Sequence, residues 1–124
     1  MSGQQRAALD AMLRDAPLDV GGDVAQQREI FAQMMAEVPV PGDVTATPGT
    51  LGGVPVVDVD VPGADPTRVI FYLHGGAYAI GSADASVGLA SDLARRAGMR
   101  AVSVDYRLAP EHPYPAGQIG RAHV

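Results

Sequence analysis

The feature that most constrains the fold of this chain is the stretch Val69–Tyr78, which reads VIFYLHGGAY. Its first half, Val69–Leu73, is a continuous run of β-branched and aromatic residues, typical of a strand buried on both faces of a parallel sheet. The apolar run then stops, and His74, Gly75 and Gly76 follow. A glycine pair directly after a buried strand lets the chain turn tightly and leaves backbone N–H groups uncovered. Parallel sheets place their ligands at such strand ends.

Two interpretations of this loop stay open on these residues alone. In the first, the exposed N–H groups hold a negatively charged oxygen. In the second, the loop is only a tight strand-to-helix connection around a buried, hydrogen-bonded His74. The rest of the sequence has to distinguish them.

Length and composition exclude several classes of protein. A chain of 124 residues is one domain at most, and its 47 % hydrophobic content is enough for a core. No stretch suits a membrane span or a signal peptide, and there is no cysteine for a disulfide or a thiolate metal site. A net charge of −5 argues against nucleic-acid binding. All nine basic residues are arginine, which suggests a GC-rich bacterial genome, and the expected location is the cytoplasm.

Two amphipathic helices are predicted near the N-terminus, over residues 3–16 and 24–37, the second behind an Asp23 N-cap. The first apolar stripe consists of Leu9, Met12, Leu13 and Ala16. The second consists of Val24, Phe31, Met34, Met35 and Val38. The outer face of the second helix is expected to carry Gln26, Gln27, Arg28 and Glu29. Its two methionines are expected to pack in the core, and the alternative is that they line an acyl pocket.

A β-hairpin is predicted next, with strands at residues 44–51 and 54–61 joined at Gly52-Gly53. In the second strand valines alternate with Asp58 and Asp60, so one face of this strand is wet. Both aspartates are therefore expected to be solvated rather than catalytic.

A βαβ unit completes the predicted core. After the strand Val69–Leu73, a helix is expected to run to about Ala97, with Ser82 or Asp84 as its N-cap and Gly98 as its stop. The next buried strand is Ala101–Val104. The helix residues expected to face the sheet are Val87, Ala90, Leu93, Ala94 and Ala97.

Two motifs coincide at the ends of the two parallel strands. HGGAY follows the first strand, and DYRLAPEHPYPA, Asp105–Ala116, follows the second. Together they resemble the bacterial hormone-sensitive-lipase-like family of α/β-hydrolase esterases. The resemblance implies an incomplete α/β-hydrolase fold of the α/β class, with cap helices, a hairpin and one parallel βαβ unit. It divides the chain into a helical cap segment at 1–38, the N-terminal part of the core at 39–117, and a tail at 118–124.

The resemblance also implies roles for the glycine loop, His74–Ile80. In that family an HGGG-type loop gives backbone N–H groups to the oxyanion hole. Carried onto this chain, the donors are Gly76 and Ala77, and Gly75 shapes the turn. Ala77 replaces the commoner glycine and keeps its backbone N–H, but a residue with a Cβ resists a positive φ.

Other residues near the motifs receive supporting roles. His74 could be taken for a catalytic base, but the family's catalytic histidine comes near the C-terminus, so His74 is expected to be structural. Tyr78 is expected to pack beside the acyl site as a substrate contact. The segment Leu108–Ala116, with three prolines, is called the proline-rich loop. The residues expected to hold it together by ion pairs and hydrogen bonds are Asp105, Arg107, Glu111 and His112.

The nucleophile, acid and base of such an enzyme are missing. No G-x-S-x-G occurs, so no serine has the required context. The chain is expected to be an N-terminal portion without esterase turnover. The strand that pairs with Val69–Leu73 in the family would also be missing, which leaves an open edge and predicts poor solubility. The last residues, Gln118–Val124, resemble a translated sequencing adapter and suggest read-through, so His123 is given no function.

The leading functional hypothesis is part of a serine carboxylesterase or lipase acting on short-to-medium acyl esters, a small-molecule substrate, without cofactor or metal. A rival is a non-catalytic relative of the same fold that binds a small ligand. A nucleotide-binding βαβ unit is a weaker third reading, because HGGAYAIG does not match G-x-G-x-x-G and Asp105 is the only candidate for a ribose contact.

Overall fold

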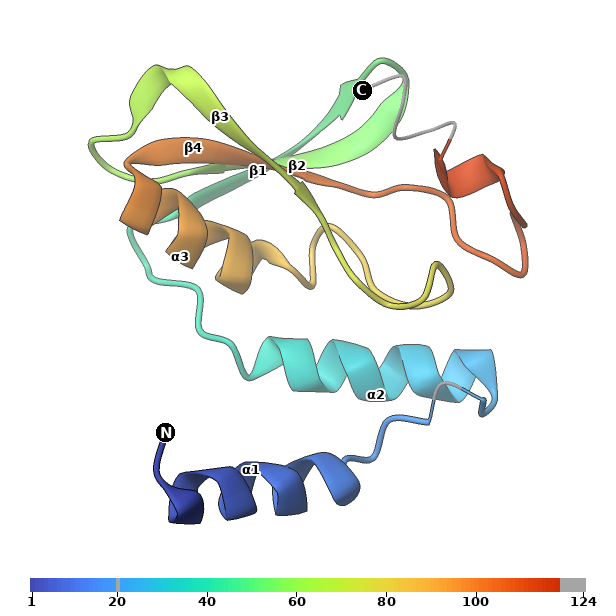
Figure 1. The fold of residues 1–124 in the computed structure, drawn as a ribbon. Coiled ribbons are helices and arrows are strands. Elements are labelled where there is room, and N and C mark those ends of the chain that lie inside the picture. The colour runs from blue at the N-terminus through green and yellow to red at the C-terminus, as the bar shows by residue number, and fades with distance from the viewer. Residues whose placement is uncertain (20, 119–124) are drawn as a thin grey trace.

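The computed structural model describes residues 1–19 and 21–118. Its elements in chain order are α1 (Gly3–Arg14), α2 (Val24–Ala36), β1 (Thr45–Leu51), β2 (Val54–Asp60), β3 (Asp65–Leu73), α3 (Val87–Ala97) and β4 (Met99–Val104). The strands form one sheet in the order β1-β2-β4-β3, with α3 packed against it and α2 and α1 set apart on that side (Figure 1).

The predicted hairpin and βαβ unit are both present. β1 pairs antiparallel with β2, and Gly52 and Gly53 between them have φ of 58° and 81°. Both angles lie in the left-handed region that a two-residue hairpin turn requires. β3 and β4 are parallel and α3 connects them, as expected from the two apolar runs. Asp60 is exposed, and Asp58 pairs with Arg100 at 2.9 Å, so neither aspartate faces the core.

The core has one apolar cluster on each face of the sheet, because successive strand residues point to opposite sides. The cluster between the sheet and α3 consists of Val57, Val59, Val61, Ala83, Val87, Ala90, Ala94 and Ala101. The cluster on the other face consists of Val56, Val102, Val104 and Tyr106. β4 lies inside the sheet and contributes to both clusters. It therefore gives β3, the strand that leads into the glycine loop, a rigid neighbour.

The prediction that Val69–Leu73 is buried on both faces is wrong for the described chain. Ile70 and Tyr72 pack on the α3-side core, but Val69 and Phe71 remain 47 % and 42 % exposed. The cause is the strand order: β3 lies at an edge of the sheet, and no helix in residues 1–19 and 21–118 covers its other face. The expected open edge on this strand is therefore present.

Helix α3 differs from prediction at its start and on one flank. Its N-cap is Ser86, not Ser82 or Asp84, although the Ser82 hydroxyl accepts the Ala85 N–H one turn earlier. Leu93 and Ala97 are exposed, and Ser91 is buried in their place. The Ser91 hydroxyl donates to the Gly88 carbonyl at 2.8 Å, which makes its burial inexpensive. Gly98 ends the helix with φ of 64°, as predicted.

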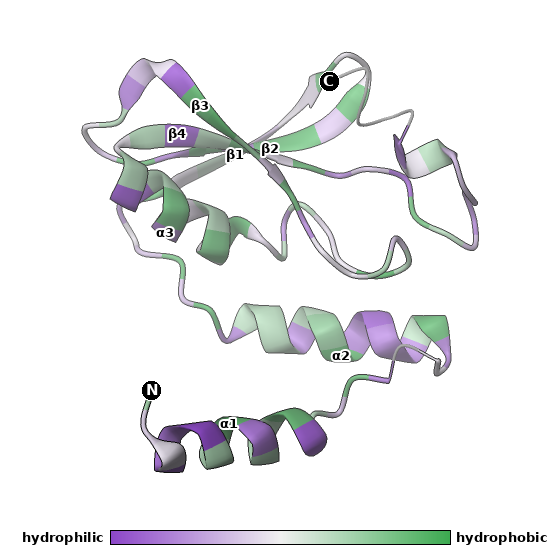
Figure 2. Cartoon of the chain, viewed as in Figure 1, coloured by the Kyte–Doolittle hydropathy of each residue, from purple (hydrophilic) through white to green (hydrophobic). Residues whose placement is uncertain are grey.

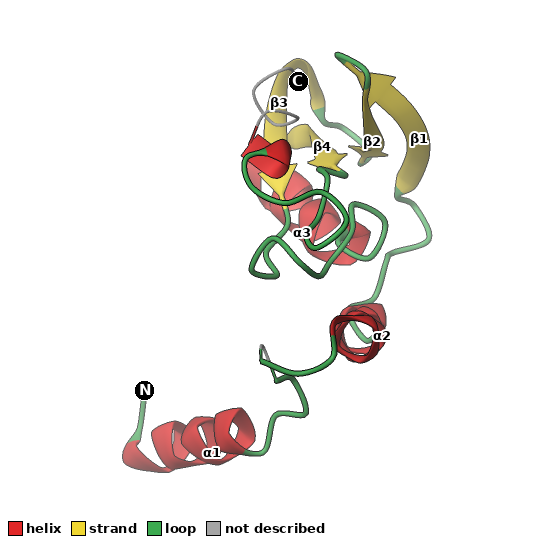
Figure 3. Ribbon diagram, turned by 90° about the vertical axis from the view of Figure 1, so that its right-hand side faces the viewer, coloured by secondary structure: helices red, strands yellow, loops and turns green. Residues whose placement is uncertain are grey.

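The two N-terminal helices are less buried than their apolar stripes suggest. No residue of α1 is buried, although a Ser2–Gln5 capping box starts the helix. Asp23 caps α2 as predicted, but Gln27, expected on the outer face, is buried, and Met34 is 41 % exposed. Figure 2 shows polar and apolar residues interleaved along both helices, and Figure 3 shows α1 set well away from the sheet.

No helix in the described residues is both long and apolar enough to cross a membrane. The division into segments 1–38, 39–117 and 118–124 stays a prediction. Most of the suggested read-through tail, residues 119–124, lies outside the described residues, as does His123.

Candidate functional site

The glycine loop continues directly from the end of β3. Gly76 has φ of 127°, and its carbonyl accepts the N–H groups of Ala79 and Ile80, both at 3.0 Å. A Cβ added at Gly76 would overlap the carbonyl oxygen of Ile80. Gly75 has no left-handed φ, and a Cβ there would meet nothing within 4 Å. The conformation that only glycine can adopt therefore belongs to Gly76 rather than to Gly75.

Ala77 does adopt the positive φ that its side chain was expected to resist. Ala77 and Tyr78 have φ of 53° and 59°, two consecutive left-handed residues with side chains. Within the described chain, neither the Gly76 N–H nor the Ala77 N–H donates a hydrogen bond. Two adjacent backbone donors are thus without a hydrogen-bond partner in the described residues.

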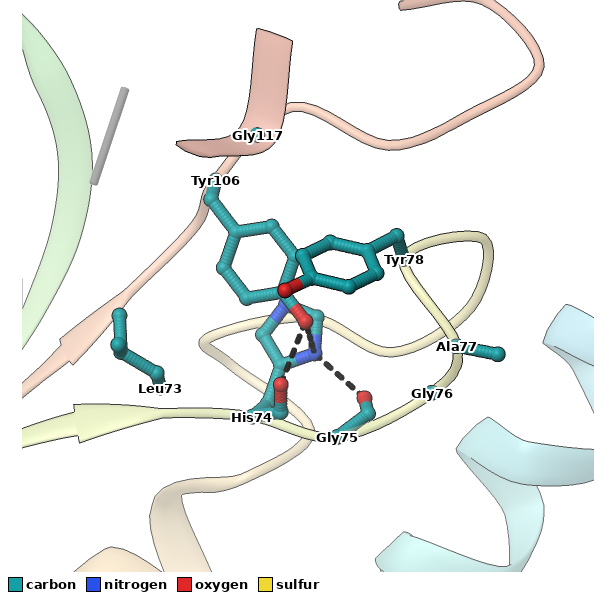
Figure 4. Close-up of a pocket in the computed structure, with 8 residues that line it drawn as sticks. All are labelled: Leu73, His74, Gly75, Gly76, Ala77, Tyr78, Tyr106 and Gly117. Atoms are coloured by element: carbon teal, nitrogen blue, oxygen red, sulfur yellow. Dashed lines mark hydrogen bonds between the residues drawn. The ribbon is translucent and has the colours of Figure 1, made fainter. Parts of the chain in front are cut away.

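A pocket of about 230 Å³ lies on one side of these residues (Figure 4). It is lined by Leu73, His74, Gly75, Gly76, Ala77, Tyr78, Tyr106 and Gly117. An apolar pocket of about 170 Å³ lies between the loop and α2. It is lined by Leu18, Gly22, Val24, Gln27, Phe31, Gly76, Ala77, Ala79 and Ile80. Gly76 and Ala77 line both pockets.

Neither methionine of α2 lines the two pockets that share the glycine loop. Met35 instead lines a separate groove of about 400 Å³ with Pro39, Ser82 and Gly88, among others. The idea that Met34 and Met35 form an acyl pocket therefore has no support in the geometry.

His74 is buried, with only 4 % of its surface exposed. Its Nδ1 lies 2.8 Å from the Gly75 carbonyl, and because a carbonyl only accepts, we assign the ring proton to Nδ1. Its Nε2 has no hydrogen-bond partner within residues 1–19 and 21–118. A Cβ at Gly81, which has φ of 95°, would overlap Nδ1. The sequence did not reveal that a glycine is needed at position 81, next to the His74 ring.

Tyr78 and Tyr106 form the upper wall of the larger pocket in Figure 4. Tyr78 is 51 % exposed, and its ring meets that of Tyr106 edge-on at 6.1 Å. Tyr106 lies just past the end of β4 and is buried. Tyr78 thus stands at the rim of the pocket, where it can contact a ligand.

The four residues expected to hold the proline-rich loop together make contacts with different parts of the chain. Asp105 accepts the Ala83 N–H at 3.0 Å, which ties the end of β4 to the segment before α3. Arg107 donates to the Ala116 carbonyl at 3.3 Å, across the loop. The His112 side chain lines a pocket of about 140 Å³. Glu111 pairs outside the loop, with Arg28 of α2.

Arg28 was expected on the outer face of its helix and is instead the main polar contact between α2 and the two loops. The guanidinium binds both carboxylate oxygens of Glu111 at 2.8 Å. The hydrogen bond from Arg28 holds the pKa of Glu111 at about 2, and the same bond raises the pKa of Arg28. The partners are 83 positions apart, so no local pattern in the sequence indicates the pair.

No group of three histidine or acidic side chains in the described part of the chain could hold a metal ion.

Three comparisons with known proteins agree on one family. A family model of the α/β-hydrolase fold matches residues 70–119. A putative acetyl-hydrolase LipR of Mycobacterium tuberculosis is 41 % identical over 92 residues, which is 74 % of this chain and 30 % of that protein. An esterase of Acinetobacter venetianus is 40 % identical over 88 residues, 71 % of this chain and 29 % of that protein.

Solved structures cover almost all of the chain. An esterase of the bacterial hormone-sensitive lipase family is 31 % identical, with a TM-score of 0.84, over 99 % of this chain and 41 % of that one. The hormone-sensitive-lipase homologue EstE7 from a metagenome library is 31 % identical, with a TM-score of 0.79, over 95 % of this chain and 39 % of that one. The chain therefore spans about 30 % of the length of the two curated relatives and about 40 % of the two solved chains.

Proposed function

The chain belongs to the α/β-hydrolase fold family and is similar to esterases of the bacterial hormone-sensitive-lipase type, and we propose that it supplies the oxyanion hole of a serine carboxylesterase. The observation that carries the proposal is the pair of adjacent amides, at Gly76 and Ala77, that line a pocket without a partner in the described protein. Two such donors suit a single oxygen that becomes negatively charged.

In the proposed reaction, a serine attacks the ester carbonyl and a histidine takes the serine proton. The carbonyl oxygen gains negative charge in the tetrahedral intermediate, and the N–H groups of Gly76 and Ala77 donate to it. They are fixed before the reaction and lose no freedom as charge develops. Loss of one donor from such a hole raises the barrier by about 2.7–4 kcal/mol.

The substrate that we propose is a carboxylic ester with a short-to-medium acyl chain. The apolar pocket beside Ala77 has about 170 Å³, below the roughly 300–1,000 Å³ of sites for drug-sized ligands. It can hold a small apolar group while the ester carbonyl lies at the Gly76–Ala77 amides. Tyr78 contacts the substrate from the rim of the neighbouring pocket, and His74 keeps a structural role.

The test is the natural gene that contains this sequence. We expect it to encode a G-x-S-x-G serine with an aspartate and a histidine downstream, and the purified product to hydrolyse p-nitrophenyl acetate and butyrate faster than the laurate. A gene without those three residues, whose product hydrolyses none of the esters, would instead support a ligand-binding relative. The 124-residue chain alone, which contains no G-x-S-x-G, is expected to show no turnover.

A further inference from the structure

The Arg28 side chain donates four hydrogen bonds, which connect α2 to both the glycine loop and the proline-rich loop. Its Nε donates to the Ala79 carbonyl at 2.8 Å, and its Nη2 donates to the Ala109 carbonyl at 3.0 Å. Both terminal nitrogens also bind Glu111. One side chain thus fixes a carbonyl of the glycine loop, a carbonyl of the proline-rich loop and a carboxylate.

These contacts surround the unusual backbone at Ala77 and Tyr78. Ala79 is the next residue, and the Tyr78 carbonyl accepts the Ala109 N–H at 2.8 Å. The two loops are therefore joined directly by the Ala109–Tyr78 hydrogen bond. They are joined a second time through Arg28, which binds the carbonyls of Ala79 and Ala109.

Left-handed backbone at two successive residues with side chains is costly. Such backbone persists only where the surrounding structure holds it in place. The Tyr78 ring also packs edge-on against Tyr106. Within the described residues, the hydrogen bonds that can hold this backbone are the two bonds to the Gly76 carbonyl, the Ala109–Tyr78 bond and the Arg28–Ala79 bond. Only the last of these comes from a side chain, so it is the one that substitution can remove.

We propose that Arg28 is a positioning residue for the oxyanion hole: by holding the Ala79 carbonyl it keeps the Gly76 and Ala77 amides aimed into the pocket. This inference rests on the function proposed above. Arg28 lines neither of the pockets that share Gly76 and Ala77, so it acts through the loop and does not touch the substrate. The role requires the planar guanidinium of arginine, because a lysine ammonium cannot reach two carbonyls and a carboxylate in this arrangement.

Hydrogen exchange of the full 124-residue chain, read by mass spectrometry at micromolar concentration, tests the proposal. The reporters are the Ala79 and Ile80 amides, which are bonded to the Gly76 carbonyl. In R28Q and in R28K we expect them to exchange about tenfold faster or more, because a charge-assisted bond to the loop is lost. Amides of β4 report whether the core stays folded.

The matched control is E111Q, which weakens the ion pair but leaves the two bonds from Arg28 to main-chain carbonyls. We expect loop exchange in E111Q to stay within about twofold of the original chain. Unchanged loop exchange in R28Q or R28K, with β4 still protected, would overturn the proposal and leave Arg28 as an anchor for α2 alone. No substrate is used, so this result is independent of whether the intact protein hydrolyses esters.

Discussion

The ring of Tyr106 lies flat against the buried ring of His74, with ring centroids 4.2 Å apart and an angle of 14° between their planes. The Tyr106 hydroxyl also donates a hydrogen bond to the His74 main-chain carbonyl. A residue just past β4 therefore fixes the first residue of the glycine loop, which extends β3. The loop is held by the neighbouring strand as well as by its own.

Tyr106→Phe should lower the free energy of unfolding by at least about 0.5–1.5 kcal/mol, the usual net contribution of one hydrogen bond. The change removes the hydroxyl's buried hydrogen bonds to the carbonyl and the ring of His74 and keeps the stacked ring. Urea denaturation measures the change. Tyr78→Phe is the matched control, since the Tyr78 hydroxyl makes no hydrogen bond within the described residues and its ring is half exposed. Equal losses in the two variants would contradict the assigned role of the Tyr106 hydroxyl.

Gly76→Ala should destabilise the chain by about 1–3 kcal/mol, the usual cost of forcing extra atoms into a packed site. The added Cβ would overlap the Ile80 carbonyl. Gly75→Ala should be close to neutral because its Cβ would enter open space. Thermal unfolding of the two variants separates these expectations. A Gly75→Ala variant as unstable as Gly76→Ala would show that Gly75 shapes the turn after all.

Ala77→Gly should stabilise the chain by roughly 1 kcal/mol, since glycine adopts φ of 53° without the cost that a Cβ imposes. Ala79→Gly provides the comparison. Ala79 is not among the residues with positive φ, so glycine there should only add backbone freedom to the unfolded chain and destabilise it. Denaturation midpoints that fall in both variants would mean that the left-handed backbone at Ala77 carries no strain.

The Arg28–Glu111 pair should make stability sensitive to acid. The folded-state pKa of Glu111 is about 2, below the ordinary 4.5, so the unfolded chain binds more protons between these values. The stabilisation is present above the ordinary pKa and is lost as pH falls toward about 2. Glu111→Gln should lack this component. Thermal midpoints at about pH 6 and pH 3 should therefore fall further in the original chain than in the variant.

The free edge of β3 should make the isolated chain self-associate. Val69 and Phe71 are nearly half exposed on this strand. Phe71→Lys, which puts a charge beside the edge, should raise the soluble monomer fraction in size-exclusion chromatography. Leu9→Lys removes an exposed apolar side chain from α1 and is the control. If both substitutions raise the monomer fraction equally, general surface apolarity and not the β3 edge causes the association.

The elements that local signals determine were predictable from sequence. Gly52-Gly53 between valine-rich segments indicated the hairpin, and Gly98 marked the end of α3. The two apolar runs indicated parallel strands with a helix between them. Each of these signals depends on residues within a few positions of one another, where backbone preference and side-chain alternation act directly.

The features that depend on distant partners were not predictable. The exposure of Phe71 follows from the place of β3 in the sheet, which its own residues do not specify. Arg28 looks like any polar residue of a helix surface until Glu111 is brought beside it. The apolar stripe of α1 has helical spacing but no partner surface in the described chain that buries it. Gly81 matters because of a contact with the His74 ring, seven positions earlier.

The two pockets beside the glycine loop share two lining residues, Gly76 and Ala77. A group that fills the pocket beside α2 therefore lies against the same two residues whose amides are proposed to hold the oxyanion. In the proposed function, the fit of the acyl group and the stabilisation of the oxyanion thus depend on the same two residues. A substitution at Gly76 or Ala77 that changes the shape of either pocket should therefore change both properties together.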